Sequence, residues 1–167
     1  MKTVFVLLFT LLISCPIASA QNVASLPLPR YASLRSNLVN SRSGPGRRYP
    51  IEWVYTQKKA PVEIEQSYEY QKELWYKIRD WENSESWVHH SMISKNRTAK
   101  VVTPGENNIY AKPNYESEVI AKVEAEVVGD IVKCPKNSEF CLLNFTSIEG
   151  WMPKKDLFGM YDDEEIK

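Results

Sequence analysis

The chain has 167 residues, enough for one ordinary domain or two very small ones, and it carries 21 basic and 21 acidic side chains. This balance excludes the strongly basic surface on which nucleic-acid binding depends. Beyond the N-terminal segment, no apolar run reaches the roughly 20 residues that cross a bilayer, so no membrane span is predicted.

The N-terminal segment has the pattern of a secretory signal peptide. Lys2 precedes an apolar run over residues 4–13, and Ala18-Ser19-Ala20 provides a small-residue cleavage site. Cleavage after Ala20 is predicted, which removes residues 1–20 and places the protein in the periplasm or outside the cell. A second interpretation takes the sequence around Cys15 as a lipoprotein box in which that cysteine is lipidated.

The residues that follow form short alternating strings separated by turn residues, which is the pattern of β-strands. Val62 and Ile64 alternate with Glu63 and Glu65, so one face of that string is buried and the other faces solvent. Helical periodicity is scarce throughout. Strands are predicted over residues 38–42, 51–56, 61–69, 74–80 and 86–93. Five short strands in about fifty residues are typical of a small barrel.

A glycine-rich loop, SGPG at 43–46, lies between the first two of these strands. A phosphate-binding loop leads into the N-terminus of a helix, but here a predicted strand follows and no Gly-Lys-Ser/Thr is present. The loop is therefore interpreted as a turn. Gly44 and Gly46 are expected to take positive φ, and Pro45 presets a turn position.

The second half of the chain repeats the plan of the first. Residues 108–123 resemble residues 38–55 in having a strand, a loop that contains proline and an apolar strand. Gly150-Trp151 stands where Ser86-Trp87 stood. Two copies of a unit of about 55 to 65 residues predict two domains or a double barrel, with the join in the polar stretch 94–101.

Cys134 and Cys141 are the two cysteines that remain after removal of the signal peptide. In an exported protein this closely spaced pair is predicted to form a disulfide, which stabilises so small a loop by roughly 2.5 kcal/mol in the chain-entropy model. A pair of free thiols is the alternative. No metal site is predicted, because two thiols without a nearby histidine cannot complete a tetrahedral shell.

Several of these motifs resemble the bacterial Src-homology-3 (SH3) domain of exported proteins, also written SH3b. In that family an N-x-R-x-G-P loop precedes a Y-P-x-x-W strand. Here NSRSGP at 40–45 precedes YPIEW at 49–53, and SWVHHSMIS at 86–94 closes the unit.

The second half resembles the partner repeat of tandem proteins of this family. Its motifs are CPKNSEFC at 134–141 and GWMPKKDLFGMY at 150–161, but its first loop lacks the arginine and the Gly-Pro of the pattern. The resemblance implies an all-β fold of two small SH3-like β-barrels in tandem. They are predicted over residues 30–96 and 97–165, the second with a disulfide hairpin.

The first repeat is rich in aromatic residues, and SH3-type barrels bind extended peptides in a shallow aromatic groove. On strand alternation, Tyr76 and Trp87 are assigned to the core. Arg42 is interpreted first as a donor that braces the loop, with anion binding as the alternative. The predicted ligand-binding residues are Arg42, Arg48, Tyr49, Trp53, Trp75 and Trp81. The competing interpretation is that most of the aromatic side chains pack between the two repeats.

No catalytic constellation is recognised, and neither enzymatic activity nor a cofactor is predicted. His89 and His90 are adjacent on a predicted strand and are expected to face opposite sides, where they cannot chelate one metal. The acidic run 162–165 is interpreted as a solvated tail. The resemblance implies a non-catalytic module that binds peptidoglycan or a cell-wall peptide. The alternative is an assembly partner of another envelope protein that uses the same aromatic surface.

Overall fold

The computed structural model describes residues 26–167, and these residues form two antiparallel β-sheets without an α-helix among them. The predicted all-β fold is therefore confirmed. The predicted signal peptide, its cleavage site and Cys15 lie outside the described residues. Among residues 26–167 there is no helix with the length and apolar character that a bilayer crossing requires.

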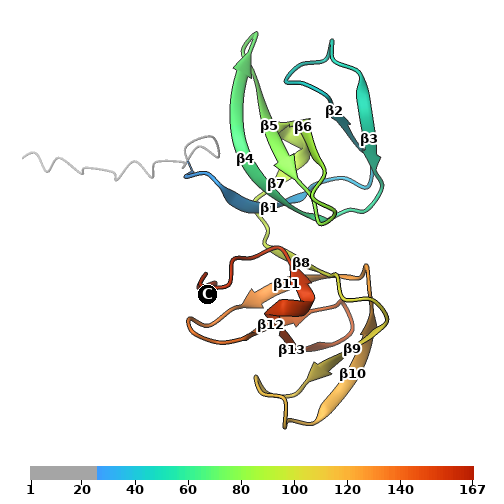
Figure 1. The fold of residues 1–167 in the computed structure, drawn as a ribbon, viewed down its shortest axis with the longest axis vertical. Helices are drawn as coiled ribbons and strands as arrows, with labels where there is room; N and C mark the ends of the chain where they lie inside the picture. The colour runs from blue at the N-terminus through green and yellow to red at the C-terminus, as the bar shows by residue number, and fades with distance from the viewer. Residues whose placement is uncertain (1–25) are drawn as a thin grey trace, which may run out of the picture.

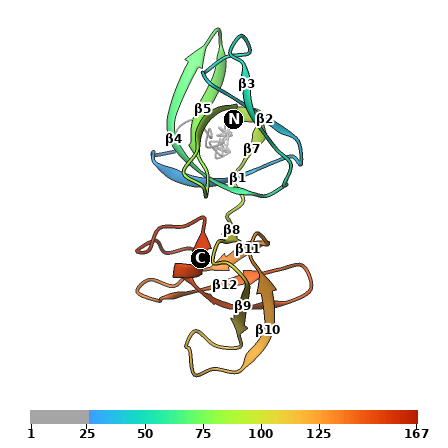
Figure 2. The ribbon, with the colours of Figure 1, turned by 45° about the vertical axis from the view of Figure 1, so that its right-hand side comes forward.

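The first sheet has the strand order β3-β2-β6-β5-β4-β1-β7 and curls around its own core. Every one of its strands contributes to one buried cluster, from Val39 of β2 and Tyr55 of β3 to Ile93 of β7. A flat sheet could not bring its two edges into one cluster, so the sheet closes into a small barrel (Figures 1 and 2). Its strands are β1 (Arg30–Leu34), β2 (Val39–Arg42), β3 (Ile51–Tyr55), β4 (Pro61–Tyr70), β5 (Glu73–Arg79), β6 (Glu85–His89) and β7 (Ile93–Ser94).

The second sheet repeats this topology, strand for strand. Its order is β10-β9-β13-β12-β11-β8-β14, and a separate buried cluster includes Ile109, Leu143 and Met152. Figure 1 shows the two units one above the other, joined at the β7–β8 connection. The strands are β8 (Thr98–Val101), β9 (Glu106–Tyr110), β10 (Val119–Glu124), β11 (Val128–Lys133), β12 (Phe140–Asn144), β13 (Glu149–Pro153) and β14 (Leu157–Phe158). The predicted domain limits at 96 and 97 fall in this connection and remain a prediction.

The structure differs from the predicted strand 86–93 at its end. Strand β6 stops at His89, and a short 3₁₀ turn, η2 (His90–Met92), separates it from β7. The His89 side chain accepts a hydrogen bond from the backbone N–H of Ser91, which favours the turn over a continued strand. The expectation that His89 and His90 face opposite sides is wrong for this reason, and their ring centroids lie 4.5 Å apart. The second sheet has the matching turn η3 (Lys154–Asp156).

Aromatic side chains and one buried carboxylate hold the two units together. The Tyr31 ring from β1 packs against Phe158 and Tyr161 of the second unit, with centroid distances of 5.3 and 4.8 Å. Tyr161 donates its hydroxyl hydrogen bond to Glu63 on β4 at 2.6 Å. Glu63 is only 4 % exposed, and Arg79 neutralises its charge. A buried charge needs such partners, so this contact couples the units specifically.

A second group of polar contacts lies close to the connection. Thr98 donates its hydroxyl to the carbonyl oxygen of Lys59 at 2.7 Å, and the Lys59 ammonium lies 2.7 Å from Asp130. The connection between the sheets is short, because β7 ends at Ser94 and β8 begins at Thr98. Few backbone torsions are thus free to change the relative placement of the two barrels.

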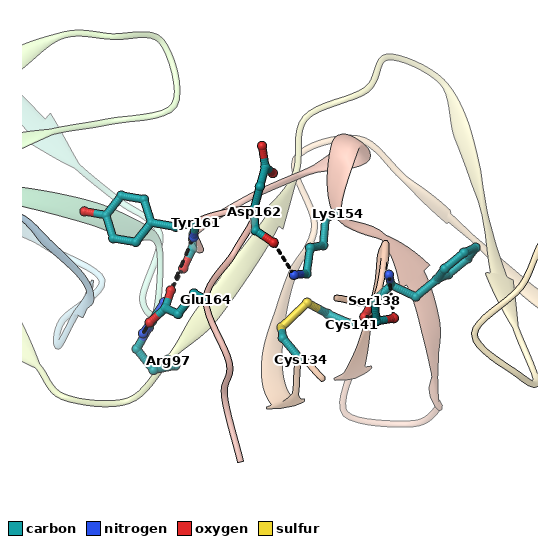
Figure 3. The surroundings of a disulfide bond; sticks show 10 residues. Arg97, Cys134, Ser138, Cys141, Lys154, Tyr161, Asp162 and Glu164 are labelled. Carbon is teal, nitrogen blue, oxygen red and sulfur yellow. Dashed lines mark hydrogen bonds and ion pairs between the residues drawn. A yellow bond between two sulfur atoms is a disulfide. The ribbon is translucent and has the colours of Figure 1, made fainter. Parts of the chain in front are cut away.

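The predicted disulfide is present and clips the β11–β12 hairpin. Cys134 and Cys141 are bonded, and both are fully buried in the second core. The backbone of Cys134 also exchanges two hydrogen bonds with Ile166, which holds the end of the chain against this hairpin. Glu164 pairs with Arg97 in the same segment (Figure 3). The interpretation of residues 162–165 as a solvated tail is therefore wrong for Glu164.

Candidate functional site

The loop of residues 43–50 is a compact turn closed by its own backbone. Ser43 N–H donates to the carbonyl of Pro50, Gly46 N–H to that of Gly44, and Tyr49 N–H to that of Gly46, at 3.0–3.2 Å. Of the two glycines in this loop, Gly46 has a positive φ and Gly44 does not. Gly44 serves a different purpose from the one predicted, because a Cβ there would lie 2.5 Å from the Tyr49 ring. Glycine is therefore required at position 44 because there is no room for a side chain, and not because of an unusual backbone torsion.

The three arginines of this region point to three different partners. The Arg42 guanidinium donates to the carbonyl of Tyr49 at 2.7 Å, which is the predicted bracing of the loop. Arg47 donates to the carboxylate of Glu73 at the start of β5 at 3.1 Å. Arg48 lies outside, over the rings of Tyr49 and Tyr70, at 5.1 and 4.8 Å from their centroids.

An open cavity of about 210 Å³ lies between this loop, β5 and η2, and we call it the first cavity. Most of its polar lining can donate hydrogen bonds, through guanidinium, amide, indole, imidazole and hydroxyl groups. The side chains that carry these groups are Asn40, Arg42, Arg47, Trp75, His89 and Ser91. The cavity is therefore suited to a ligand that is rich in acceptors, such as an extended peptide backbone or a carboxylate.

Trp75 forms a wall of the first cavity but is almost completely buried. Its exposed fraction is 2 %, so it does not lie on an open groove as predicted. Alternation placed Tyr76 in the core correctly and Trp75 on the other face of β5. That other face is covered here, because η2 packs on β5 and the His89 ring lies 5.3 Å from the Trp75 indole. Among the described residues the indole N–H has no hydrogen-bond partner.

His89 is held neutral in the wall of this cavity. Burial is the largest cause and the charge of His90 the second of a lowered pKa for His89, below its ordinary value of 6.5. The neutral ring accepts from the N–H of Ser91 through Nδ1, and the Ser91 hydroxyl lies 2.7 Å from the same atom. Nε2 then carries the proton, so the ring adds one more donor.

The remaining predicted residues do not gather at the first cavity. Trp53 lies on the edge strand β3 with 57 % of its surface exposed. Trp81 packs at the junction, where the Lys100 ammonium lies 3.5 Å from its ring centroid. This is the packing between repeats that the competing interpretation expected. Trp87 was assigned to the core, but it is partly exposed on the outer face of β6, edge-on to Tyr68.

The predicted ligand-binding residues include Arg42 and Trp75 but miss the other four polar residues of the first cavity, Asn40, Arg47, His89 and Ser91. Asn40 lies two positions before Arg42 on β2, so both side chains share a face of that strand. This spacing could have identified it. His89 and Ser91 could not be found in the same way, because their position depends on the end of β6 and the turn that follows.

Comparison with known proteins identifies the first unit. Residues 35–95 match the family described as bacterial SH3 domain. Among solved structures, NlpC1 and NlpC2 from Trichomonas vaginalis are each 18 % identical to this chain, with a TM-score of 0.34. They cover 81 % and 82 % of this chain, which spans about half of theirs, 48 % and 50 %. No curated protein sequence matches. Residues 35–95 thus match the bacterial SH3 domain family, and the second barrel repeats the strand order of the first.

Proposed function

We propose that this chain is a non-catalytic binding protein of the bacterial envelope, which holds an extended cell-wall peptide in the first cavity. Bacterial SH3 domains are cell-wall binding modules, and residues 35–95 match that family. The observation that carries the proposal is Trp75, which lines the cavity and whose buried indole N–H has no partner in the described part of the chain. A buried donor without an acceptor is costly, and a ligand carbonyl would satisfy it.

The surrounding donors support a peptide as the ligand. Arg42 keeps donors beyond the one that braces the loop, and Asn40 is exposed beside it. Extended peptides present a carbonyl at every residue, so a line of fixed donors can hold them with little dependence on sequence. Both cysteines of residues 26–167 are joined in the disulfide, which leaves no thiol nucleophile there. We place the protein in the periplasm or outside the cell, as its N-terminal sequence predicts.

The proposal is tested by sedimentation with purified peptidoglycan. The site variant is Asn40→Ala/Trp75→Phe, which removes two donors of the first cavity and keeps an aromatic ring in the wall. The matched control is Trp53→Ala, because Trp53 is an exposed aromatic residue that does not line the cavity. We expect the unaltered chain and the control to sediment with peptidoglycan, and the site variant to lose at least tenfold in affinity.

Two results contradict this function in different ways. If the site variant sediments as well as the unaltered chain, the first cavity is not the binding site. If the unaltered chain does not sediment, wall binding is wrong, and an envelope protein becomes the favoured partner. The exposed side chains of Ile51, Trp53 and Val54 on β3 favour that second function, because exposed apolar groups of this kind mark protein contacts.

A further inference from the structure

A second, larger cavity of about 420 Å³ lies on the corresponding side of the second barrel. The equivalence follows from strand pairing. Trp75 pairs with His89 directly before η2, and Phe140 pairs with Pro153 directly before η3. The second cavity lies beside η3 and the residues that lead into β12, as the first lies beside η2 and β5.

The loops beside the two cavities also have the same backbone. In loop 111–118, Ala111 N–H donates to the carbonyl of Glu118, Asn114 N–H to Lys112, and Ser117 N–H to Asn114, at 2.8–3.4 Å. These bonds have the spacing found in loop 43–50, and by this count Tyr115 takes the place of Arg47. The second cavity therefore overlaps the position of the first at Tyr115 and Lys155, which correspond to Arg47 and Ser91, and the rest of its lining differs.

Lys154 gives the second cavity a buried positive charge. Only 6 % of this residue is exposed, and its ammonium donates to the backbone carbonyl of Asp162 at 2.6 Å. Figure 3 shows this bond, with the Asp162 carboxylate turned away from the ammonium. Within residues 26–167 no carboxylate forms an ion pair with Lys154. Lys100 provides a contrast, because it is also buried, at 2 % exposed, but forms an ion pair with Glu126.

Glu164 interacts electrostatically with Lys154 but is paired with another cation. Burial would raise the pKa of Glu164, but hydrogen bonds and the charge of Arg97, with a smaller contribution from Lys154, hold that pKa below its ordinary value. Both oxygens of the Glu164 carboxylate bond to Arg97. The Lys154 ammonium thus keeps two N–H donors for an incoming acceptor, and a buried cation without a counter-charge favours an anionic one.

The rest of the lining selects the kind of anion. Tyr115 is 49 % exposed, packs against Phe140 at 4.8 Å and carries the Lys155 ammonium 5.3 Å above its ring. Two acidic residues, Glu139 and Asp162, line the same cavity. The two acidic residues would repel a multiply charged phosphate. Two lysines together with two acidic residues instead match a ligand that carries one carboxylate and one amine.

We propose that the second cavity is a binding site for the end of a peptide with a free carboxylate, which Lys154 receives while Glu139 and Asp162 face its amine. The disulfide supports this site, because Cys134 and Cys141 bracket the turn that carries Asn137, Ser138 and Glu139. Lys154 N–H also donates to the Glu139 carbonyl at 2.7 Å, which fixes that turn against η3. The inference rests on the proposed function in one respect, that the ligand is a peptide.

The test follows backbone amide signals of the labelled chain by NMR during titration with trialanine. Trialanine amide is the comparison probe, since it lacks only the carboxylate. We expect saturating shifts at residues 137–139 and 154–155 with trialanine, and at least tenfold weaker binding of the amide. Lys154→Met should weaken trialanine binding at least tenfold, and so should Tyr115→Ala. Lys122→Met is the matched control, because Lys122 is exposed on β10 and pairs with Glu106.

Each outcome decides the proposal. Equal binding of acid and amide, or unchanged binding by Lys154→Met, would overturn it. If Lys154→Met fails to fold, two other measurements decide. One is trialanine binding by Tyr115→Ala, since Tyr115 is exposed, and the other is the comparison of trialanine with its amide. Shifts around Asn40 and Trp75 alone would overturn the second site and leave the proposed function standing. If the shifts appear at the second cavity and Asn40→Ala/Trp75→Phe still binds peptidoglycan, the second site stands. The first cavity is then not the site of the proposed function.

Discussion

The two loops 43–50 and 111–118 have the same three backbone hydrogen bonds and no chemistry in common. The first brings Arg42 and Arg47 to a cavity beside a buried tryptophan, and the second brings Tyr115 to a cavity beside two lysines. Backbone bonds depend little on side-chain identity, whereas the side chains that line a cavity decide which ligands it can hold. The comparison teaches that one barrel architecture can carry cavities with two different linings in a single chain.

The largest effects are expected from matched truncations in the two cores. Ile78 and Leu143 are both fully buried and hold equivalent positions on β5 and β12. Replacing either with alanine should lower the free energy of unfolding by about 2–5 kcal/mol, because each leaves a cavity. Urea unfolding followed by tryptophan fluorescence and by circular dichroism should show one shared transition in both variants. Two separate transitions would show that the junction does not couple the barrels.

Removal of the disulfide distinguishes the repeats, since only the second has one. Cys134→Ser/Cys141→Ser should lower the free energy of unfolding by about 2.5 kcal/mol, because the unfolded chain regains the freedom of the closed loop. Thermal unfolding with and without a reductant measures the same effect on the unaltered chain. An unchanged melting temperature under reducing conditions would contradict the prediction.

A substitution in each loop tests the close contact that only the first loop contains. Gly44→Ala should destabilise the protein by about 1–2 kcal/mol, because the new Cβ meets the Tyr49 ring at 2.5 Å. Lys112→Ala at the equivalent position should change stability by less than about 0.5 kcal/mol, since Lys112 is exposed. Equal effects in chemical denaturation would show that the ring moves away freely.

The smallest effect concerns pH, and again only one repeat carries the group. The pKa of His89 is lowered in the folded protein, so the unfolded chain binds the proton more readily. The contribution of neutral His89 to the free energy of unfolding is fully present above about pH 6.5. It is lost as the pH falls through the lower pKa that His89 has in the folded state. His89→Gln should flatten the stability profile in this range. Pro153 takes the place of His89 in the second repeat and cannot titrate.

Strand patterns predicted most of the first barrel, including β3 and β4. Alternation placed Val62 and Ile64 of β4 in the core correctly, but it did not predict that Glu63 is buried as well. Four of the five β3 residues are exposed, so β3 was identified by its β-branched and aromatic residues rather than by a buried face. Strand patterns did not predict β1, whose short string RYASL lacks a clear alternation. The repeat of motifs in the second half predicted a second barrel, and the spacing of Cys134 and Cys141 predicted their bond. These features depend on local pattern, which a single sequence contains.

The candidate site was harder to predict because it depends on what covers the outer face of a strand. Alternation separates Trp75 from Tyr76, but it does not reveal that η2 lies over Trp75. It also cannot show that Trp87 is left partly open. Glu164 finds Arg97 across 67 positions of sequence, and no local pattern predicts a pair at that separation.

The short β7–β8 connection and the contacts of Tyr31 and Glu63 have a consequence for polymeric ligands. Two sites on a flexible tether find their targets over a range of spacings, at an effective concentration set by the tether. Two sites on barrels that are docked together accept only the spacings that their own separation allows. Such a protein would gain avidity on a repeating polymer only where the repeat distance of the polymer matches the separation of the two sites.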